Sequence, residues 1–289
     1  MTGTTDRTFR AMNTEWWIAA GDDADLDGAE ALVHEIEARL SRFRQHSALS
    51  RLNRERVATD PWLAEVVSLA LEAHVLTDGA FDIRVAEALA LAGYDRSFEL
   101  IATHPASAGI AMRPACGTAV TVRGDTVRLD GRGSVDLGGV AKGWAVDRVA
   151  AQLAASGATS WFVDGGGDLR AAGLDAGGHP WLAGAADGQA VRMDEGAVCT
   201  SSTLRRRWPS AGGGVAHHII DPASGLPAVT GVTTAVVVAE DAATADMLAT
   251  AVIASPARGL AAVHAVDGEA MVEHDGRWEM TPGMGRWLA

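Results

Sequence analysis

Two side chains that could hold a divalent cation, Asp246 and Thr250, lie four residues apart in the segment ADMLAT. A helix with this spacing presents the carboxylate and the hydroxyl on one face. Mg²⁺ binds oxygen ligands and usually keeps water or substrate phosphate in its octahedron. Together with a backbone carbonyl, the pair therefore favours a magnesium site. An Asp–Thr hydrogen bond near the start of the helix is the alternative.

A glycine-dense segment, DLGGVAKG at residues 136–143, is typical of a turn that opens a helix. Glycines there let backbone N–H groups approach a phosphate closely, and Lys142 can add a positive charge. The alternative is a tight strand-to-helix turn with Lys142 in solvent. The segment is not a Walker motif, because Lys142 is displaced from the required position. The G-x-G-x-x-G pattern fails at Arg170, which disfavours a Rossmann dinucleotide site.

His218 belongs to the segment HHIIDPASG at residues 217–225. An apolar pair followed by Asp-Pro-x-x-Gly predicts a strand that ends in a turn, so His218 would lie at a sheet edge. Histidine is the side chain best suited to proton transfer near neutral pH. The alternatives are that His218 is a hydrogen-bonded structural histidine and that Asp221 merely caps the turn.

Two further segments place carboxylates beside glycine, namely GAFD at residues 79–82 and DGGGD at residues 164–168. Such turns are common, so each is weak evidence by itself. Phe81 could form an aromatic wall of a flavin or adenine pocket, although ordinary core is the default for a phenylalanine.

The composition limits the chemistry that these residues can serve. The chain has 289 residues, of which 48% are apolar and 21% are charged, and this excludes disorder as the main state. Lys and Arg number 24 against 37 Asp and Glu, which gives a net charge of −13, so nucleic acid is not expected as a partner. An anionic small molecule would therefore need a metal ion or backbone N–H groups to hold it.

Cysteine usage and apolar runs bear on the compartment. Cys116 and Cys199 form no C-x-x-C pair, which excludes a thiolate zinc or redox motif and leaves a single disulfide open. The N-terminal segment lacks the apolar region of a signal peptide, and no later run approaches the ~18 apolar residues of a membrane span. We therefore expect a cytoplasmic protein with no stable membrane insertion.

The elements that must position these residues follow from periodicity. Apolar residues at spacings of three and four predict helices at 27–43, from Asp60-Pro61 onward, after Phe81, after the glycine turn and at 243–254. Alternating and β-branched runs predict strands at 161–163 and 232–240 and hairpins at 118–129 and 269–280. Residues 44–59 are expected to be a polar connector. The irregular alternation of helices, strands and hairpins favours an α+β class and one compact domain, residues 1–289.

Taken in order along the chain, the motifs resemble those of the ApbE family, the Mg²⁺-dependent FAD:protein FMN transferases. The resemblance covers most of the chain, and it rests on the segments MNTEW (12–16), SALSRLN (47–53), TDGAFD (77–82), VDLGGVAKGWAVD (135–147), GGGD (165–168), HHIIDPASG (217–225) and ADMLATA (245–251). Each motif is short, and their order makes the set specific.

The resemblance implies a fold and a set of site residues. The fold would be α+β, with T-fold-like mixed sheets and flanking helices that enclose a flavin cleft. Mg²⁺ would be held by Asp246, Thr250 and the main-chain carbonyl of Gly139. FAD would be bound by Met12, Phe43, Ala80, Phe81, Asp82, Asp136, Lys142, His218 and Ile219, with His218 beside the flavin and the transferring phosphate.

The implied reaction moves FMN from FAD to a Thr or Ser hydroxyl of an acceptor protein and releases AMP. His218 is the predicted general base, with Asp168 and Asp221 as alternatives. Two other hypotheses are an FAD pyrophosphatase and an FAD-binding protein without turnover.

Some positions depart from the family pattern. Residues 201–205 are SSTLR where the family tends to have SGDYR, Asn13 replaces a glycine, and Arg84 and Ala86 replace threonine and glycine. Trp208 is the nearest aromatic that could compensate for the missing tyrosine.

Overall fold

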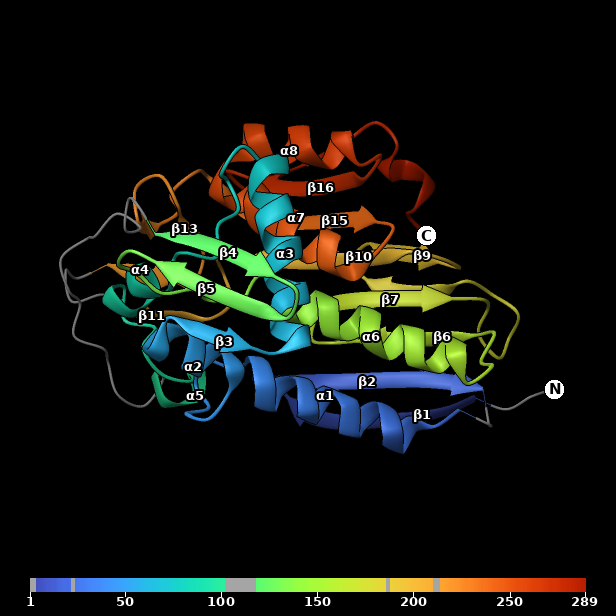
Figure 1. The fold of residues 1–289 in the computed structure, drawn as a ribbon. Helices are drawn as coiled ribbons and strands as arrows, with labels where there is room; N and C mark the ends of the chain where they lie inside the picture. Colours follow the sequence, from blue (N-terminus) through green and yellow to red (C-terminus); the bar gives the residue numbers. More distant parts are fainter. Residues whose placement is uncertain (1–3, 22–23, 102–117, 186–187, 210–213) are drawn as a thin grey trace.

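The computed structural model describes residues 4–21, 24–101, 118–185, 188–209 and 214–289 (Figure 1). Its centre is an eight-stranded sheet in the order β1-β2-β6-β7-β10-β15-β16-β17, in which every neighbouring pair is antiparallel. The strands are β1 Thr4–Ala11, β2 Thr14–Gly21, β6 Trp161–Asp164, β7 Asp168–Ala172, β10 Ala197–Ser202, β15 Val232–Ala239, β16 Glu269–His274 and β17 Arg277–Met280.

Helices cover one face of this sheet. Figure 1 shows α1 (Leu26–Leu40), α6 (Ala141–Ala155), α7 (Ala242–Ala254) and α8 (Pro256–Ala265) along the same side of the strands. Successive strand residues point to opposite faces, so Ile18 and Val237 pack with these helices while Ala19 and Val236 belong to the core on the other face. β8 (Trp181–Gly184), β9 (Ala190–Met193) and η1 (Met284–Arg286) help to cover that second face.

Smaller elements surround one end of the sheet. A three-stranded sheet, β3-β5-β4, consists of Val57–Thr59, Thr126–Asp130 and Ala119–Arg123. It lies beside α2 (Ala48–Glu55) and α3 (Pro61–Leu76). A third hydrophobic cluster, which we call the peripheral core, is formed by Ala88, Leu89, Tyr94, Ile101, Trp208, Ala216 and Ile220. Its elements are α4 (Ala86–Leu91), α5 (Phe98–Ile101), β11 (Arg207–Pro209), β12 (Val215–His217) and β13 (Ile220–Asp221), and β13 pairs with β14 (Leu226–Pro227).

The α+β class predicted from the sequence is confirmed, as are the long helices and the two hairpins. Asp60 caps α3 as predicted, because its side chain accepts a hydrogen bond from the Leu63 N–H at 3.0 Å. The predicted helix at 27–43 ends earlier, at Leu40, since Ser41 is extended. Phe43 therefore leaves the helix face and packs against the peripheral core.

The prediction of a polar connector at 44–59 was wrong. This segment contains α2 and β3, and Ser47 caps α2 by accepting a hydrogen bond from the Ser50 N–H at 2.9 Å. Eight residues with three buried side chains, Ala48, Leu49 and Leu52, give too short a stripe for periodicity to stand out.

The disulfide left open by the sequence involves Cys116, which lies outside the described residues. Cys199 is buried, and its thiol donates to the Ala242 carbonyl at 3.3 Å. Among the helices that the structure describes, none combines the length and apolarity needed to cross a bilayer.

Candidate active site

A cavity of about 510 Å³ opens where the sheet, the glycine turn, α7 and the peripheral core meet. It is lined by all twelve residues that the family resemblance assigns to the metal and FAD sites. They are Met12, Phe43, Ala80, Phe81, Asp82, Asp136, Gly139, Lys142, His218, Ile219, Asp246 and Thr250. Residues far apart in the sequence therefore contribute to one place, as a shared ligand site requires.

The glycine turn brings backbone close to α7. Asp136 accepts a hydrogen bond from the Gly138 N–H at 2.8 Å and so holds the turn. A Cβ on Gly139 would lie 3.3 Å from Thr250 Oγ1 and 3.1 Å from the Phe81 ring, so a side chain there would crowd both. Directly after this turn α6 begins, with Ala141 and Lys142 on the cavity wall. The N–H groups of a helix start are suited to an anion.

Asp246 and Thr250 both lie on α7, which is buried along most of its length. Asp246 is 3% exposed, and its Oδ2 accepts from the Gly143 N–H at 3.3 Å. The Thr250 hydroxyl pairs instead with Ser201 Oγ at 3.2 Å. The Asp–Thr hydrogen bond considered from the sequence does not occur between these two described residues. Burial raises the pKa of Asp246, and the nearby charge of Lys142 acts in the opposite direction.

The donor set around Asp246 fits a hard cation. A carboxylate, a hydroxyl and a carbonyl are all oxygen ligands, which Mg²⁺ prefers. The described residues contain no group of three or more His, Cys, Asp or Glu side chains that could hold a metal. An ion bound here would therefore complete its shell with water and substrate oxygens.

Lys142 is not in solvent, contrary to the alternative considered for the glycine turn. Its ammonium donates to Asp168 Oδ2 and lies 3.9 Å from Asp246 Oδ2. Asp168 is 1% exposed and its carboxylate holds this ion pair. Asp221 accepts from the Ala223 N–H at 2.9 Å and so caps the turn after β13. Both carboxylates already have hydrogen-bond partners, whereas His218 Nδ1 has none among the residues that the structure describes, so His218 is better placed to accept a proton.

Two adjacent histidines differ sharply. His217 Nε2 bonds to the Ala228 carbonyl at 3.0 Å, and its Nδ1 accepts from the Ile219 N–H at 3.3 Å. His218 lines the cavity, and its buried Nδ1 has no hydrogen-bond partner within the described part of the chain. Burial lowers the pKa of His218 well below 6.5, with further lowering from the charge of Arg206. His217, and not His218, is therefore the hydrogen-bonded structural histidine of this pair.

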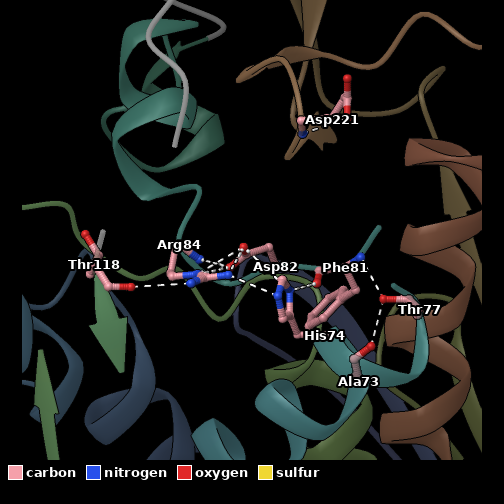
Figure 2. Close-up of polar contacts among 9 residues, drawn as sticks. Ala73, His74, Thr77, Phe81, Asp82, Arg84, Thr118 and Asp221 are labelled. Carbon is pink, nitrogen blue, oxygen red and sulfur yellow. Dashed lines mark hydrogen bonds and ion pairs between the residues drawn. The ribbon is translucent and has the colours of Figure 1, made fainter. Parts of the chain in front are cut away.

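Hydrogen bonds to residues at the end of α3 hold the segment Ala80–Asp82 in place (Figure 2). The Phe81 N–H donates to Thr77 Oγ1 at 3.0 Å, and the Thr77 hydroxyl donates to the Ala73 carbonyl at 2.7 Å. His74 Nδ1 lies 3.0 Å from the Phe81 carbonyl oxygen. The Phe81 backbone is therefore held on both its N–H and its carbonyl, and its ring faces Gly139.

Arg84, which replaces the family's threonine, binds the carboxylate of Asp82. Its Nε lies 2.8 Å and 3.0 Å from the two oxygens, and Nη2 lies 2.6 Å from Oδ2. The same guanidinium lies 3.1 Å from His74 Nε2 and 3.3 Å from the Thr118 carbonyl oxygen. Figure 2 shows both contacts as dashed lines. The departure thus adds a cation that neutralises one acidic residue of the cavity wall.

An aromatic wall closes the opposite side of the cavity. Phe43 and Tyr94 line it with their rings 5.7 Å apart, and Arg42 lies over both rings at 4.3 Å and 4.8 Å. Arg42 Nε also lies 2.6 Å from Asp136 Oδ2. Trp208 stacks behind Tyr94 at 5.5 Å and donates to the Ala92 carbonyl at 2.7 Å.

Trp208, the nearest candidate for a compensating aromatic, is buried behind Tyr94 and is not among the residues that line the cavity. Sequence reasoning missed Tyr94, although it is the single tyrosine in the chain. It also missed the lining residues Arg42, Ser201, Ser202 and Arg206. The run of three arginines at 205–207 is the sequence signal that could have pointed to Arg206.

Comparison with known proteins gives consistent matches. A model of the ApbE family matches residues 12–272. The FAD:protein FMN transferase of Vibrio cholerae is 31% identical over 252 residues, which cover 82% of this chain and 75% of that protein. The flavin transferase ApbE structure from Vibrio cholerae superposes with a TM-score of 0.76 at 25% identity and covers 100% of both chains. The ApbE protein structure from Thermotoga maritima gives 0.82 at 25% identity over 98% of this chain and 99% of that one.

Proposed function

This chain belongs to the ApbE family, and on that premise we propose that it is an FAD:protein FMN transferase, moving FMN from FAD to an acceptor protein. The observation that carries the proposal is the cavity, in which every residue expected from the family motifs lies on one wall or another. A cavity of about 510 Å³ falls within the 300–1,000 Å³ typical of small-molecule sites. We take residues 1–289 as one functional domain.

The two ends of the cavity suit the two ends of a flavin nucleotide. Phe43 and Tyr94 offer apolar surface for a flat ring, while the glycine turn, against which Phe81 packs, offers N–H groups for phosphate. Met12, Ala80 and Ile219 complete the proposed FAD site. Asp82 and Asp136 each bind an arginine, so their charge is compensated and they serve to position the wall.

We propose that Asp246, Thr250 and the Gly139 carbonyl hold Mg²⁺. When bound, the ion supplies positive charge that neutralises pyrophosphate oxygens and polarises phosphorus. Lys142 lies between Asp168 and Asp246, so its ammonium keeps two buried carboxylates compatible with an anionic substrate. This arrangement explains how a protein of net charge −13 can accept FAD.

His218 is the proposed general base for the acceptor hydroxyl. Its lowered pKa keeps the imidazole neutral near pH 7, and no described group occupies its Nδ1. In the proposed step, the Thr or Ser oxygen bonds to the FMN phosphorus and the bridging bond to AMP breaks. The hydroxyl proton passes to His218, and AMP leaves with the bridging oxygen.

The test is intact-mass spectrometry of an acceptor protein that carries an Asp-Gly-x-x-Thr sequence, incubated with this protein, FAD and Mg²⁺. We expect an FMN-sized mass gain that disappears in EDTA and with a Thr→Val acceptor. AMP release without mass gain would replace transfer by FAD hydrolysis. Bound FAD with neither product would leave a flavin-binding protein and reject the enzymatic proposal.

A further inference from the structure

Four cationic side chains line the cavity, and they differ in how their charge is used. Arg42 is ion-paired with Asp136 at 2.6 Å, and Lys142 is ion-paired with Asp168. Arg205 and Arg206 have no ion pair or hydrogen bond to any side chain or carbonyl that the structure describes. Arg205 is exposed to solvent, whereas Arg206 is a half-buried cation of the cavity wall with no described protein group to accept from it.

The backbone turns Arg206 inward. β10 ends at Ser202, and the turn that follows is held by the Thr203 N–H bonding to the Thr233 carbonyl at 2.9 Å. Arg206 then adopts φ +49°, in the left-handed region that is uncommon for a residue with a side chain. Arg205 and Arg207 on either side are exposed, whereas Arg206 is half-buried. Such strain tends to occur where a side chain must face a ligand.

The positive charge of Arg206 acts on three groups around the cavity, namely Tyr94 at the aromatic wall, His218, and Asp246 at the proposed metal site. It adds to the lowering of the His218 pKa and opposes the rise that burial causes in the pKa of Tyr94 and of Asp246. Arg205 acts instead on Asp164, which accepts from the Gly166 and Gly167 N–H groups in the β6–β7 turn. Arg206 is therefore the half-buried arginine of the cavity wall whose charge acts on both His218 and Asp246.

We propose that Arg206 is a further catalytic residue that binds a phosphate oxygen of the FAD pyrophosphate, between His218 and Asp246. The inference rests on the proposed function and adds a residue to that site. A guanidinium presents N–H donors in a planar fork that matches two oxygens of a phosphate. Its charge would offset charge that builds on the phosphoryl oxygens as the bond to AMP breaks.

The experiment compares Arg206→Gln and Arg206→Lys with Arg207→Gln, a matched control that removes the same charge from the exposed neighbour. Binding of FAD and of riboflavin, which has the ring but no phosphate, is measured by flavin fluorescence with Mg²⁺ present. We expect Arg206→Gln to weaken FAD binding about 10- to 100-fold and to leave riboflavin binding within about twofold, since a hydrogen bond to a charged group is lost.

Turnover gives a second readout. For Arg206→Gln we expect kcat to fall as well as KM to rise, with partial recovery in Arg206→Lys and little change in Arg207→Gln. Equal loss of FAD and riboflavin binding would mean that Arg206 only supports the wall, and wild-type behaviour in Arg206→Gln would also overturn the proposal.

The two proposals fail separately. A selective loss of FAD binding without any acceptor labelling by the wild type would keep Arg206 as a phosphate ligand and reject the transferase. Normal acceptor labelling by Arg206→Gln would keep the transferase and reject Arg206 as a phosphate ligand.

Discussion

The two sides of the cavity are built differently. The metal side consists of Gly139, Lys142, Asp246 and Thr250, carried by the glycine turn, α6 and α7 within the main core. The ring side, named for Phe43 and Tyr94, also carries Arg206 and His218, the two residues proposed to act at the phosphate, and all four come from short segments around the peripheral core.

The residues of the metal side are held by longer and more fully packed elements than those of the ring side. α7 has 13 residues, of which 11 are buried, so Asp246 and Thr250 are placed by a helix that is packed along its length. The ring side depends on strands of two or three residues, β11 to β14. Sites on regular elements hold their geometry more tightly than sites on loops. Residues 201–205, SSTLR, lie between the two sides, because Ser201 pairs with Thr250 on α7 and Arg205 lines the cavity beside Arg206.

The largest expected effect is on the metal side. Asp246→Asn keeps the side-chain shape and removes the charged ligand, so we expect Mg²⁺-dependent turnover to fall by roughly 10³-fold or more, since metal charge stabilisation amounts to several kcal/mol. FAD should still bind through the aromatic wall. The measurement is AMP release and acceptor labelling over a Mg²⁺ titration.

Glu240→Gln is the control for this variant, because it removes an exposed carboxylate just before the same helix. Its turnover should match the wild type. Unchanged turnover in Asp246→Asn at saturating FAD would remove Asp246 from the metal site and make the two sides of the cavity equal in importance.

A smaller effect is expected on the ring side. Tyr94→Leu removes the ring that lies between Phe43 and Trp208, and an aromatic contact contributes about 0.5–1.5 kcal/mol. We therefore expect FAD and riboflavin affinity to fall together by roughly 3- to 10-fold, with kcat nearly unchanged. Tyr94→Phe retains the ring and should bind both ligands as the wild type does. Loss of binding in Tyr94→Phe would instead assign the role to the hydroxyl.

The same division explains what could be predicted from the sequence. Asp246 and Thr250 share one helical turn, and the glycine turn precedes its helix directly, so local spacing was sufficient on the metal side. Tyr94, Arg42 and Arg206 meet only through tertiary packing of segments with no periodicity of their own. Strands as short as β13 and β14 leave no pattern to detect. The order of the large sheet, in which β2 pairs with β6, is likewise set by contacts between distant segments.

In the apo protein, acidification should affect the stability of the two sides in opposite directions. Burial raises the pKa of Asp246, so on the metal side the folded state takes up a proton more readily than the unfolded chain. Burial lowers the pKa of His217 and of His218, so on the ring side the folded state takes up protons less readily. Since His217 already donates from Nε2 and accepts at Nδ1, a second proton would displace the Ile219 N–H.

The expected outcome is a loss of ring-side stability as the pH falls below 6.5. There the unfolded chain binds protons that the folded state does not, and each one-proton difference changes the unfolding free energy by up to about 1.4 kcal/mol per pH unit. Urea unfolding at pH 7.5, 6.5 and 5.5, without metal or FAD, should show a shallower pH slope in His218→Gln than in the wild type. The exposed His179→Gln is the control and should retain the full slope. An unchanged slope in His218→Gln would mean that this imidazole binds protons equally in the folded protein and in the unfolded chain, and it would contradict the lowered pKa on which its role as general base rests.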